Sequence, residues 1–300
     1  MDEVVRMLGH NIKVHYAGAE QYSFSKCAAI AGVKYYLFTV LPFIGSEMGV
    51  NTFPPLGGRG KFIPHEIAKF SKHTIMDSGL FTLMFGAQAG KRDEAFLTEW
   101  QERLCNFVNT NKLDVTCVEV DAQRVLGVEE AWKFRTKLRD MLPNNRQINV
   151  FHIPDGKKGL DRLIEFSEYI AISVPELRLF KGKSYKEDVY KLSCYIKNRK
   201  PAIDIHLLGC TEDGLLKRCS FCTSSDSTSW VSCVRFGNVL GRHISQVDRN
   251  LVTKYWNEAK AHVIDTGMEP TEERVFKYAR ICAISYLYKL AYIKAAGSQE

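Results

Sequence analysis

The sequence has no run of 18 or more apolar residues, so it offers no segment long enough to span a membrane as a helix. The amino-terminal residues MDEVVRMLGH lack the basic and then apolar layout of a secretory signal. Nine cysteines, an odd number without regular spacing, do not form the pattern of a secreted disulfide framework. We therefore expect a soluble cytoplasmic protein whose thiols are reduced.

The sequence also contains no internal repeat and no low-complexity segment. An apolar content of 45% over 300 residues is enough to bury one sizeable core. We expect a single domain over residues 1–300, with a helical extension over about residues 245–300.

The net charge of +7 is a moderate excess that gathers in short basic clusters. Such clusters suit a phosphate backbone, although the solvated faces of enzymes with neutral ligands carry similar charge. The clusters that we take as candidates for nucleic-acid binding are Arg59 with Lys61, Lys157 with Lys158, and Lys181 with Lys183.

Eight short runs of β-forming residues alternate with longer amphipathic stretches, a pattern that predicts βα units and a parallel sheet. Because eight parallel strands close a barrel, we predict an α/β fold, the (β/α)8 TIM barrel with C-terminal helices. Two amphipathic stretches, residues 93–108 and 129–141, carry apolar faces that we assign to the core. The predicted strands are residues 12–16, 35–40, 74–77, 115–121, 148–153, 169–174, 203–209 and 221–226.

Two segments depart from this alternation. Residues 41–62 are rich in Gly and Pro and contain Arg59 and Lys61, so this loop either covers a phosphate backbone or is irregular without such a role. Residues 247–264 and 271–294 are predicted as two helices that pack across the barrel or against a second subunit. The oligomeric state stays open, with a homodimer as one option.

Polar residues end several predicted strands, and the carboxyl ends of the strands carry the active site of a parallel barrel. Among them are Asp77, Asp121, His152 and Asp226. One such aspartate commonly caps the following helix, but three carboxylates at one rim favour a site. Neighbouring carboxylates in a partly desolvated pocket acquire separated pKa values, so one acts as a nucleophile while another holds a proton. This division of roles is typical of glycosyl transfer through a covalent intermediate.

The strand ends also carry short motifs: Met76-Asp77-Ser78-Gly79, Val120-Asp121, His206-Leu207-Leu208-Gly209 and Glu212-Asp213-Gly214-Leu215-Leu216. In this order they resemble motifs of the queuine- and archaeosine-type tRNA-guanine transglycosylases, over about residues 70–235. His152, the short chain and the segment Cys222-Thr-Ser-Ser-Asp226-Ser-Thr-Ser-Trp230 look more like the DNA-guanine transglycosylases (DpdA) of phages and bacteria. For a phage enzyme, the expected compartment is the host cytoplasm.

The resemblance implies a role for each matching residue. Asp226 matches the aspartate that attacks the sugar C1′, and Asp77 matches the one that shuttles a proton and contacts the base. The implied partners are guanine in DNA and a free 7-deazaguanine, such as 7-cyano-7-deazaguanine. An acceptor carboxylate suits the N1–H and amine edge that both bases share. The implied base-binding residues are Asp121, His152, Ser173, Val174 and Ser78.

The sequence departs from the tRNA enzymes at their structural zinc, which three closely spaced cysteines and a histidine hold downstream of the nucleophile. Only Cys233 and Cys282 follow Asp226, and the pair Cys219 and Cys222 would point to opposite faces of a strand. We therefore expect no metal and no cofactor. Loss of a zinc subdomain favours DNA over tRNA.

A guanine stacked in a duplex is closed to attack at C1′, so the target must be extruded or single-stranded. Phe81, Phe151 and Trp230 are aromatic candidates near the mouth, each also suited to the core. Three alternatives stay open: a tRNA-guanine transglycosylase, a non-catalytic nucleic-acid-binding barrel, and a small-molecule glycosidase or lyase. Retention of both Asp77 and Asp226 argues against the binding module, and the basic clusters argue against the third.

Overall fold

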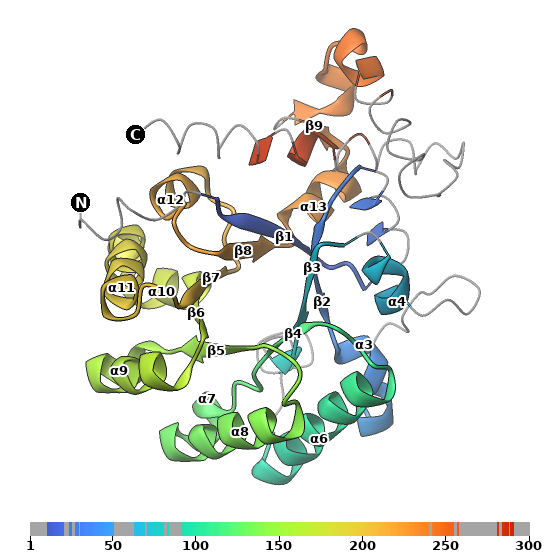
Figure 1. Cartoon of the computed structure of the whole chain (residues 1–300). Coiled ribbons are helices and arrows are strands. Elements are labelled where there is room, and N and C mark those ends of the chain that lie inside the picture. The colour runs from blue at the N-terminus through green and yellow to red at the C-terminus, as the bar shows by residue number, and fades with distance from the viewer. Residues whose placement is uncertain are drawn as a thin grey trace. The chain divides into compact units, whose positions relative to one another are not determined.

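Eight parallel strands form one closed barrel in the order β1 to β8, with helices interleaved along the chain (Figure 1). The predicted (β/α)8 TIM barrel is thereby confirmed. The structure, a computed structural model, describes residues 11–20, 24–25, 28–29, 31–50, 63–69, 71–80, 83, 92–239, 242–254, 257, 281, 284–287 and 289–290.

All eight strands lie where the sequence predicts them. Their residues are buried on both faces, as in β6, where four of five side chains are buried, because a parallel sheet is covered by helices. The strands are β1 Lys13–Ala17, β2 Tyr35–Thr39, β3 His73–Asp77, β4 Thr116–Val118, β5 Gln147–Phe151, β6 Tyr169–Ser173, β7 Asp204–Leu208 and β8 Ser224–Ser227.

Two strands differ most in extent from the prediction. β4 ends at Val118, so Asp121 lies in the connection after the strand rather than at its last position. β8 begins at Ser224, because the chain before it turns through a hydrogen bond from the Cys222 N–H to the Cys219 carbonyl. Cys222, which falls inside the predicted range 221–226, therefore precedes the observed strand.

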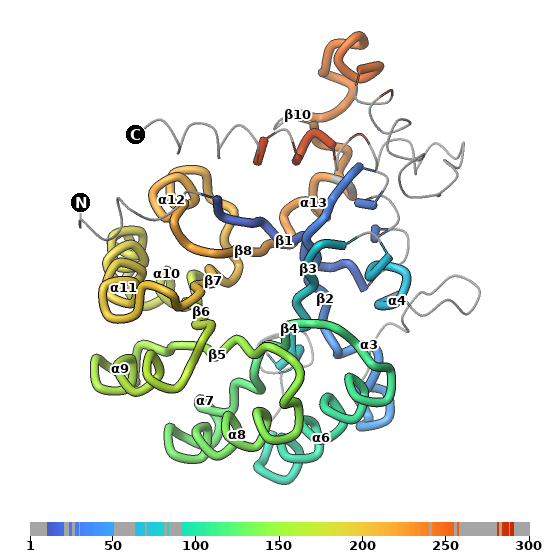
Figure 2. Tube along the Cα trace, viewed as in Figure 1, coloured from blue at the N-terminus to red at the C-terminus, as the bar shows by residue number. Residues whose placement is uncertain are grey.

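The central part of the chain runs regularly from strand to helix, and Figure 2 traces this path in green and yellow from β4 to β7. The first long helix, α6, begins after Asp93, whose carboxylate accepts a hydrogen bond from the Phe96 N–H at 2.9 Å. It buries Leu97, Trp100 and Leu104, as predicted. The helices of this part are α6 Glu94–Thr110, α7 Gln123–Leu126, α8 Val128–Met141, α9 Gly156–Phe166, α10 Val174–Lys181 and α11 Tyr185–Arg199.

Shorter elements complete the described chain. Within the predicted loop 41–62, Leu41–Ile44 forms α3 and Ser46–Met48 forms a 3-10 turn, whereas Arg59 and Lys61 lie outside the described residues. None of the helices within the described residues is long and apolar enough to cross a bilayer. The remaining elements are α4 Ile63–Ala68, α12 Asp213–Arg218, α13 Ser229–Phe236, the antiparallel pair β9 Asn238–Val239 and β10 Arg242–His243, and the 3-10 turns Ile153–Asp155, Gly182–Ser184 and Ile244–Gln246.

The predicted C-terminal helices are described in part. Residues 249–254 are helical within the first predicted range. In the second range residues 284–287 are helical, and Ile281, Ile284 and Leu290 are buried as the apolar stripe predicts. The rest of both ranges lies outside the described residues.

Two compact units divide the chain by the density of internal contacts. One includes Phe38–Pro55 and Thr74–Leu208, and the other includes Leu8–Leu37, Leu56–His73 and Gly209–Glu300, so far as these ranges are described. Asp77, Asp121 and His152 belong to the first unit, and Asp226 belongs to the second. The prediction of one domain over residues 1–300 stays a prediction.

Candidate active site

Asp226, the predicted nucleophile, lies next to the end of β8 and is 8% exposed. Its Oδ1 accepts a hydrogen bond from the Gly209 N–H at 2.8 Å. Gly209 directly follows β7 and has a φ of +62°, a left-handed conformation that glycine adopts without a steric cost. A backbone donor therefore fixes the orientation of this carboxylate.

Asp77, the predicted proton shuttle, is the last residue of β3. Its Oδ2 accepts a hydrogen bond from the Gly79 N–H at 2.9 Å. Gly79 has a φ of +75°, and a Cβ atom on it would lie 2.7 Å from the Thr39 Oγ1, so only glycine fits. Ser78 between them is buried, and its carbonyl accepts from the Trp100 Nε1 at 2.9 Å. Each predicted catalytic aspartate thus receives an amide N–H from a left-handed glycine.

A cluster of hydroxyl groups follows Asp226. The Ser229 Oγ lies 2.9 Å from the Ser227 Oγ, 2.9 Å from the Thr211 Oγ1 and 2.8 Å from the Tyr286 hydroxyl. Burial raises the pKa of Tyr286, and the negative charge of Asp226 adds to this rise. The phenol is therefore a neutral hydrogen-bonding group at physiological pH.

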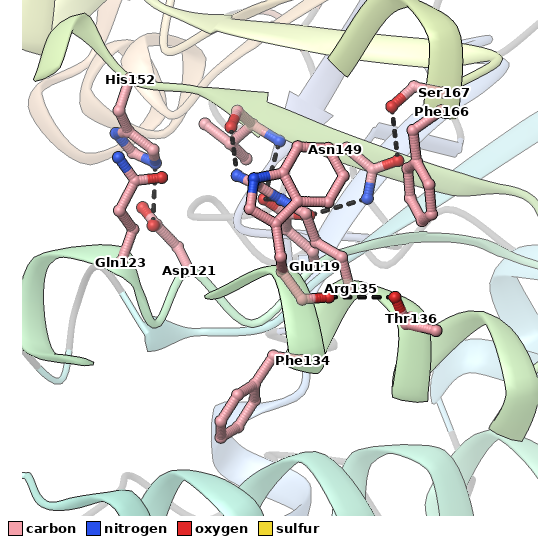
Figure 3. A network of polar contacts seen from close by, with 12 residues as sticks. Glu119, Asp121, Gln123, Phe134, Arg135, Thr136, Asn149, His152, Phe166 and Ser167 are labelled. Carbon is pink, nitrogen blue, oxygen red and sulfur yellow. Dashed lines mark hydrogen bonds and ion pairs between the residues drawn. The ribbon is translucent and has the colours of Figure 1, made fainter. Parts of the chain in front are cut away.

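His152, the first residue after β5, lies between the carboxylates of Glu176 and Asp121, and Figure 3 shows the side that faces Asp121. Its Nδ1 is 2.8 Å from the Glu176 Oε2, and its Nε2 forms an ion pair with the Asp121 Oδ1 at 2.8 Å. Arg124 approaches the other oxygen of Glu176, with its Nη2 at 3.2 Å from Oε1. Burial lowers the pKa of His152, but the two carboxylates outweigh burial and raise it to about 10.

Glu176 is an ionised partner in this group. Burial raises its pKa, but His152 and then Arg124 outweigh burial, so the pKa of Glu176 lies below its ordinary value. Its position follows from helix capping, because its own N–H donates to the Ser173 Oγ at 3.4 Å at the start of α10. The predicted base-binding pair Ser173 and Val174 thus spans the junction of β6 and α10, where Val174 is buried. Its base contact stays a prediction.

The Asp155 carboxylate binds the backbone of His152 at the start of the next turn. The Asp155 Oδ2 accepts from the His152 N–H at 3.3 Å, and the Asp155 Oδ1 accepts from the Gln123 Nε2 at 2.5 Å. Gln123 belongs to α7, two residues after Asp121. The connections after β4 and β5 are therefore linked to each other beside the imidazole.

A buried ion pair lies beneath this group, two residues before Asp121. Glu119 and Arg135 are each 3% exposed at the side chain, and the Arg135 Nε is 3.0 and 2.9 Å from the two Glu119 oxygens (Figure 3). Asn149 and the Val150 N–H also donate to the Glu119 carboxylate, at 2.7 and 3.0 Å. Because Glu119 is saturated by protein donors, it supports the ends of β4 and β5 and is not available to a ligand.

The predicted basic clusters have different outcomes. Lys157, Lys158, Lys181 and Lys183 are exposed. Lys157 and Lys181 come together with Lys191 and Asp188 around a cavity of about 420 Å³ between α9, α10 and α11. Its apolar walls are formed by Phe151, Ile153, Leu160, Leu177, Leu192 and Tyr195.

The three aromatic candidates also differ. Phe151 and Trp230 are buried, and the Trp230 Nε1 donates to the Ala17 carbonyl at 2.7 Å, so Trp230 is a core residue. Phe81 lies outside the described residues. Large exposed apolar side chains occur instead at Leu179 and Phe180 at the end of α10, 76% and 59% exposed.

Within the described residues, neither the thiols nor the side chains that could bind metal indicate a further site. Burial raises the pKa of Cys210 to about 12, so its thiol is unreactive at neutral pH. Cys219 and Cys222 are buried thiols at the turn before β8. In the part of the chain that the structure describes, no three His, Cys, Asp or Glu side chains are grouped to hold a metal ion.

Sequence reasoning missed Glu176, Arg124 and Tyr286. Glu176 stands three residues after Ser173, and this spacing is typical of a helix cap, so it gives no separate indication of a site. Arg124 follows Asp121 by three residues and carries no motif, and Tyr286 sits inside an apolar helical stripe. A signal for Glu176 exists only in hindsight, as a buried acid at a helix start directly after a strand end.

No protein-family model matches the chain, and no curated protein matches it significantly. The family resemblance therefore rests on the short motifs and on the barrel fold.

Proposed function

We propose that the chain is a base-exchange transglycosylase that replaces guanine in DNA with a 7-deazaguanine, such as 7-cyano-7-deazaguanine. Asp226 attacks the sugar C1′, the bond from C1′ to N9 of guanine breaks, and Asp77 gives a proton to the leaving base. The incoming base then loses its N9 proton to Asp77 and attacks C1′, which releases Asp226. Both carboxylates return to their starting states.

The observation that carries this proposal is the shared arrangement of the two aspartates. Each lies at the end of a barrel strand and accepts an N–H from a left-handed glycine, Gly79 or Gly209. A nucleophilic carboxylate must keep one orientation toward C1′, and a fixed backbone donor achieves this at no side-chain entropy cost. These glycines are the last residues of two motifs on which the resemblance rests.

Base recognition in the proposal falls to Asp121. An ionised carboxylate accepts hydrogen bonds only, and guanine and 7-deazaguanines both present the N1–H and the 2-amino group as donors. The Asp121 side chain is 30% exposed, and its Oδ1 is buried against His152, so the accessible polar atom is Oδ2. A carboxylate in this state suits the outgoing and the incoming base in turn.

The basic cavity between α9, α10 and α11 supports a polynucleotide as the substrate. Three lysines face one aspartate around it, so its rim attracts an anion. The neighbouring Phe180 is exposed beside Lys181, and aromatic side chains among basic ones are typical of surfaces that stack and neutralise single strands.

The proposal is tested by incubating the purified protein with 7-cyano-7-deazaguanine and DNA oligonucleotides that contain guanine, single- and double-stranded. Mass spectrometry of the digested nucleosides should show the deazaguanine in DNA. Asp226→Asn should lower exchange by at least about a thousandfold, because the covalent route is lost. A protein–DNA adduct that survives denaturing electrophoresis should form with the wild type only.

Asp140→Asn serves as the matched control, because Asp140 is exposed on α8 and takes no part in the site. Undiminished exchange by Asp226→Asn would reject the nucleophile. An RNA oligonucleotide of the same sequence belongs in the same assay. Exchange on RNA alone would favour the tRNA-guanine transglycosylase, and binding without any exchange would favour the non-catalytic barrel.

A further inference from the structure

We propose that His152 is a cationic positioning residue, which holds Asp121 as the acceptor for the donor edge of a nucleobase and so sets the base specificity of the site. This inference rests on the proposed function and refines it. The resemblance places His152 in contact with the base, whereas the geometry points to an action through Asp121.

The first step of the argument is the occupancy of both imidazole nitrogens. Nδ1 lies 2.8 Å from a Glu176 oxygen, and Nε2 lies 2.8 Å from an Asp121 oxygen. A neutral imidazole carries only one N–H, so it would place a lone pair against one of these carboxylates. The doubly protonated ring directs an N–H at each side: it donates a hydrogen bond to Glu176, and it forms a close ion pair with Asp121 that lies outside ideal hydrogen-bond geometry. With both nitrogens occupied, His152 has no polar atom left for a base.

The second step concerns the charges that face His152. Two carboxylates contact the ring, and Arg124 contacts the far oxygen of Glu176, so Glu176 stays ionised and does not share a proton with Asp121. The surrounding charges also include Asp155, which accepts from the His152 N–H, and the buried pair beneath. The charged groups from all neighbouring elements are Asp121, Arg124, Asp155, Glu176, Glu119 and Arg135.

The third step concerns the carboxylate oxygen of Asp121 that remains accessible to a ligand. The buried Oδ1 of Asp121 is committed to the imidazolium, so its accessible Oδ2 meets the ligand. A ligand that places a donor there gains a charge-assisted hydrogen bond, and a ligand that places an acceptor there meets like partial charges. The site therefore selects guanine first, hypoxanthine second because it keeps N1–H alone, and adenine last because its N1 is an acceptor.

The experiment measures equilibrium binding of free guanine, hypoxanthine and adenine to the wild type, His152→Gln and Glu176→Gln at several pH values. His152→Gln should bind guanine about tenfold more weakly or worse, the loss expected for one charge-assisted hydrogen bond, and should lose most of its preference over adenine. His243→Gln is the matched control, because His243 is exposed and lies outside this group.

Glu176→Gln gives an independent readout that a merely structural role would not produce. Guanine affinity of the wild type should be constant from pH 6.5 to about 8.5, since the imidazolium persists across this range. In Glu176→Gln the ring loses one carboxylate, so affinity should fall as pH rises. Nuclear magnetic resonance of the labelled imidazole should show both ring nitrogens protonated at pH 8 in the wild type.

The outcomes separate the two proposals. Wild-type protein that binds guanine, together with a His152→Gln variant that keeps both affinity and preference, would overturn the positioning role and leave the proposed function standing. A neutral imidazole at pH 8 would overturn it as well. Wild-type protein that binds none of the bases would overturn the proposed function itself.

Discussion

The charge on His152 makes the stability of the fold depend on pH in a predictable direction. The pKa of His152 rises from an ordinary 6.5 to about 10 in the folded chain, because two carboxylates hold its proton. Between these values the folded chain keeps one proton that the unfolded chain releases. The resulting stabilisation is complete below pH 6.5 and disappears as pH rises through about 10.

The magnitude follows from the size of the shift. One pKa unit corresponds to about 1.4 kcal/mol, so the full contribution is about 5 kcal/mol, and roughly half of it is lost between pH 7 and pH 9. Carboxylates and arginines of an unfolded chain titrate outside this window. Buried thiols such as Cys210 titrate near it, but they are shared by the wild type and His152→Gln and cancel when the two proteins are compared.

The assay is urea unfolding of the wild type and His152→Gln at pH 7, 8 and 9, with the free energy of unfolding compared at each pH. The difference between the two proteins should shrink by about 2 to 3 kcal/mol from pH 7 to pH 9. His243→Gln should keep a constant difference from the wild type. A constant difference for His152→Gln would refute the doubly paired imidazolium, whatever the chain does to nucleic acid.

Two further predictions concern the support of the site. Gly79→Ala should lower the free energy of unfolding by about 2 kcal/mol or more in thermal or urea denaturation, because the added Cβ clashes in a left-handed backbone. Gly127→Ala should cost less, because φ there is +86° but no atom lies within 4 Å of the added Cβ. Glu119→Gln should cost about 3 to 5 kcal/mol by leaving the Arg135 cation buried without a carboxylate, whereas Glu130→Gln at an exposed pair should cost under about 1 kcal/mol; equal costs would contradict the buried pair.

The barrel could be predicted because its signals are local. Apolar runs of four to six residues alternate with stretches of helical periodicity, so each strand can be predicted from its own residues. The helix after Asp93 can also be predicted from local residues, because a capping aspartate defines its start and apolar residues three and four apart define its buried face. The errors fall at strand ends, as at β4, which ends at Val118 and leaves Asp121 in the connection that follows.

Only those candidate site residues that lie at strand ends could be predicted from the sequence. Asp77, Asp121, His152 and Asp226 all follow from the rule that parallel barrels place polar groups at carboxyl ends. Their partners do not follow, because partnership depends on contacts between distant segments. Tyr286 meets Ser229 across 57 residues, and no local pattern encodes that contact.

His152 illustrates how a position can be predicted from sequence while its partners cannot. Its place after β5 identifies it as a site residue, but a histidine is equally able to donate to a base, accept from one, or carry a charge. Which of these it does depends on the two acids around it, and one of them, Glu176, lies beyond the next strand at the start of α10. Since that helix start also carries the Ser173 cap, the backbone turn that ends β6 is what delivers the second carboxylate to the imidazole. The specificity that we propose for Asp121 therefore depends on a capping interaction that would otherwise contribute only to helix stability.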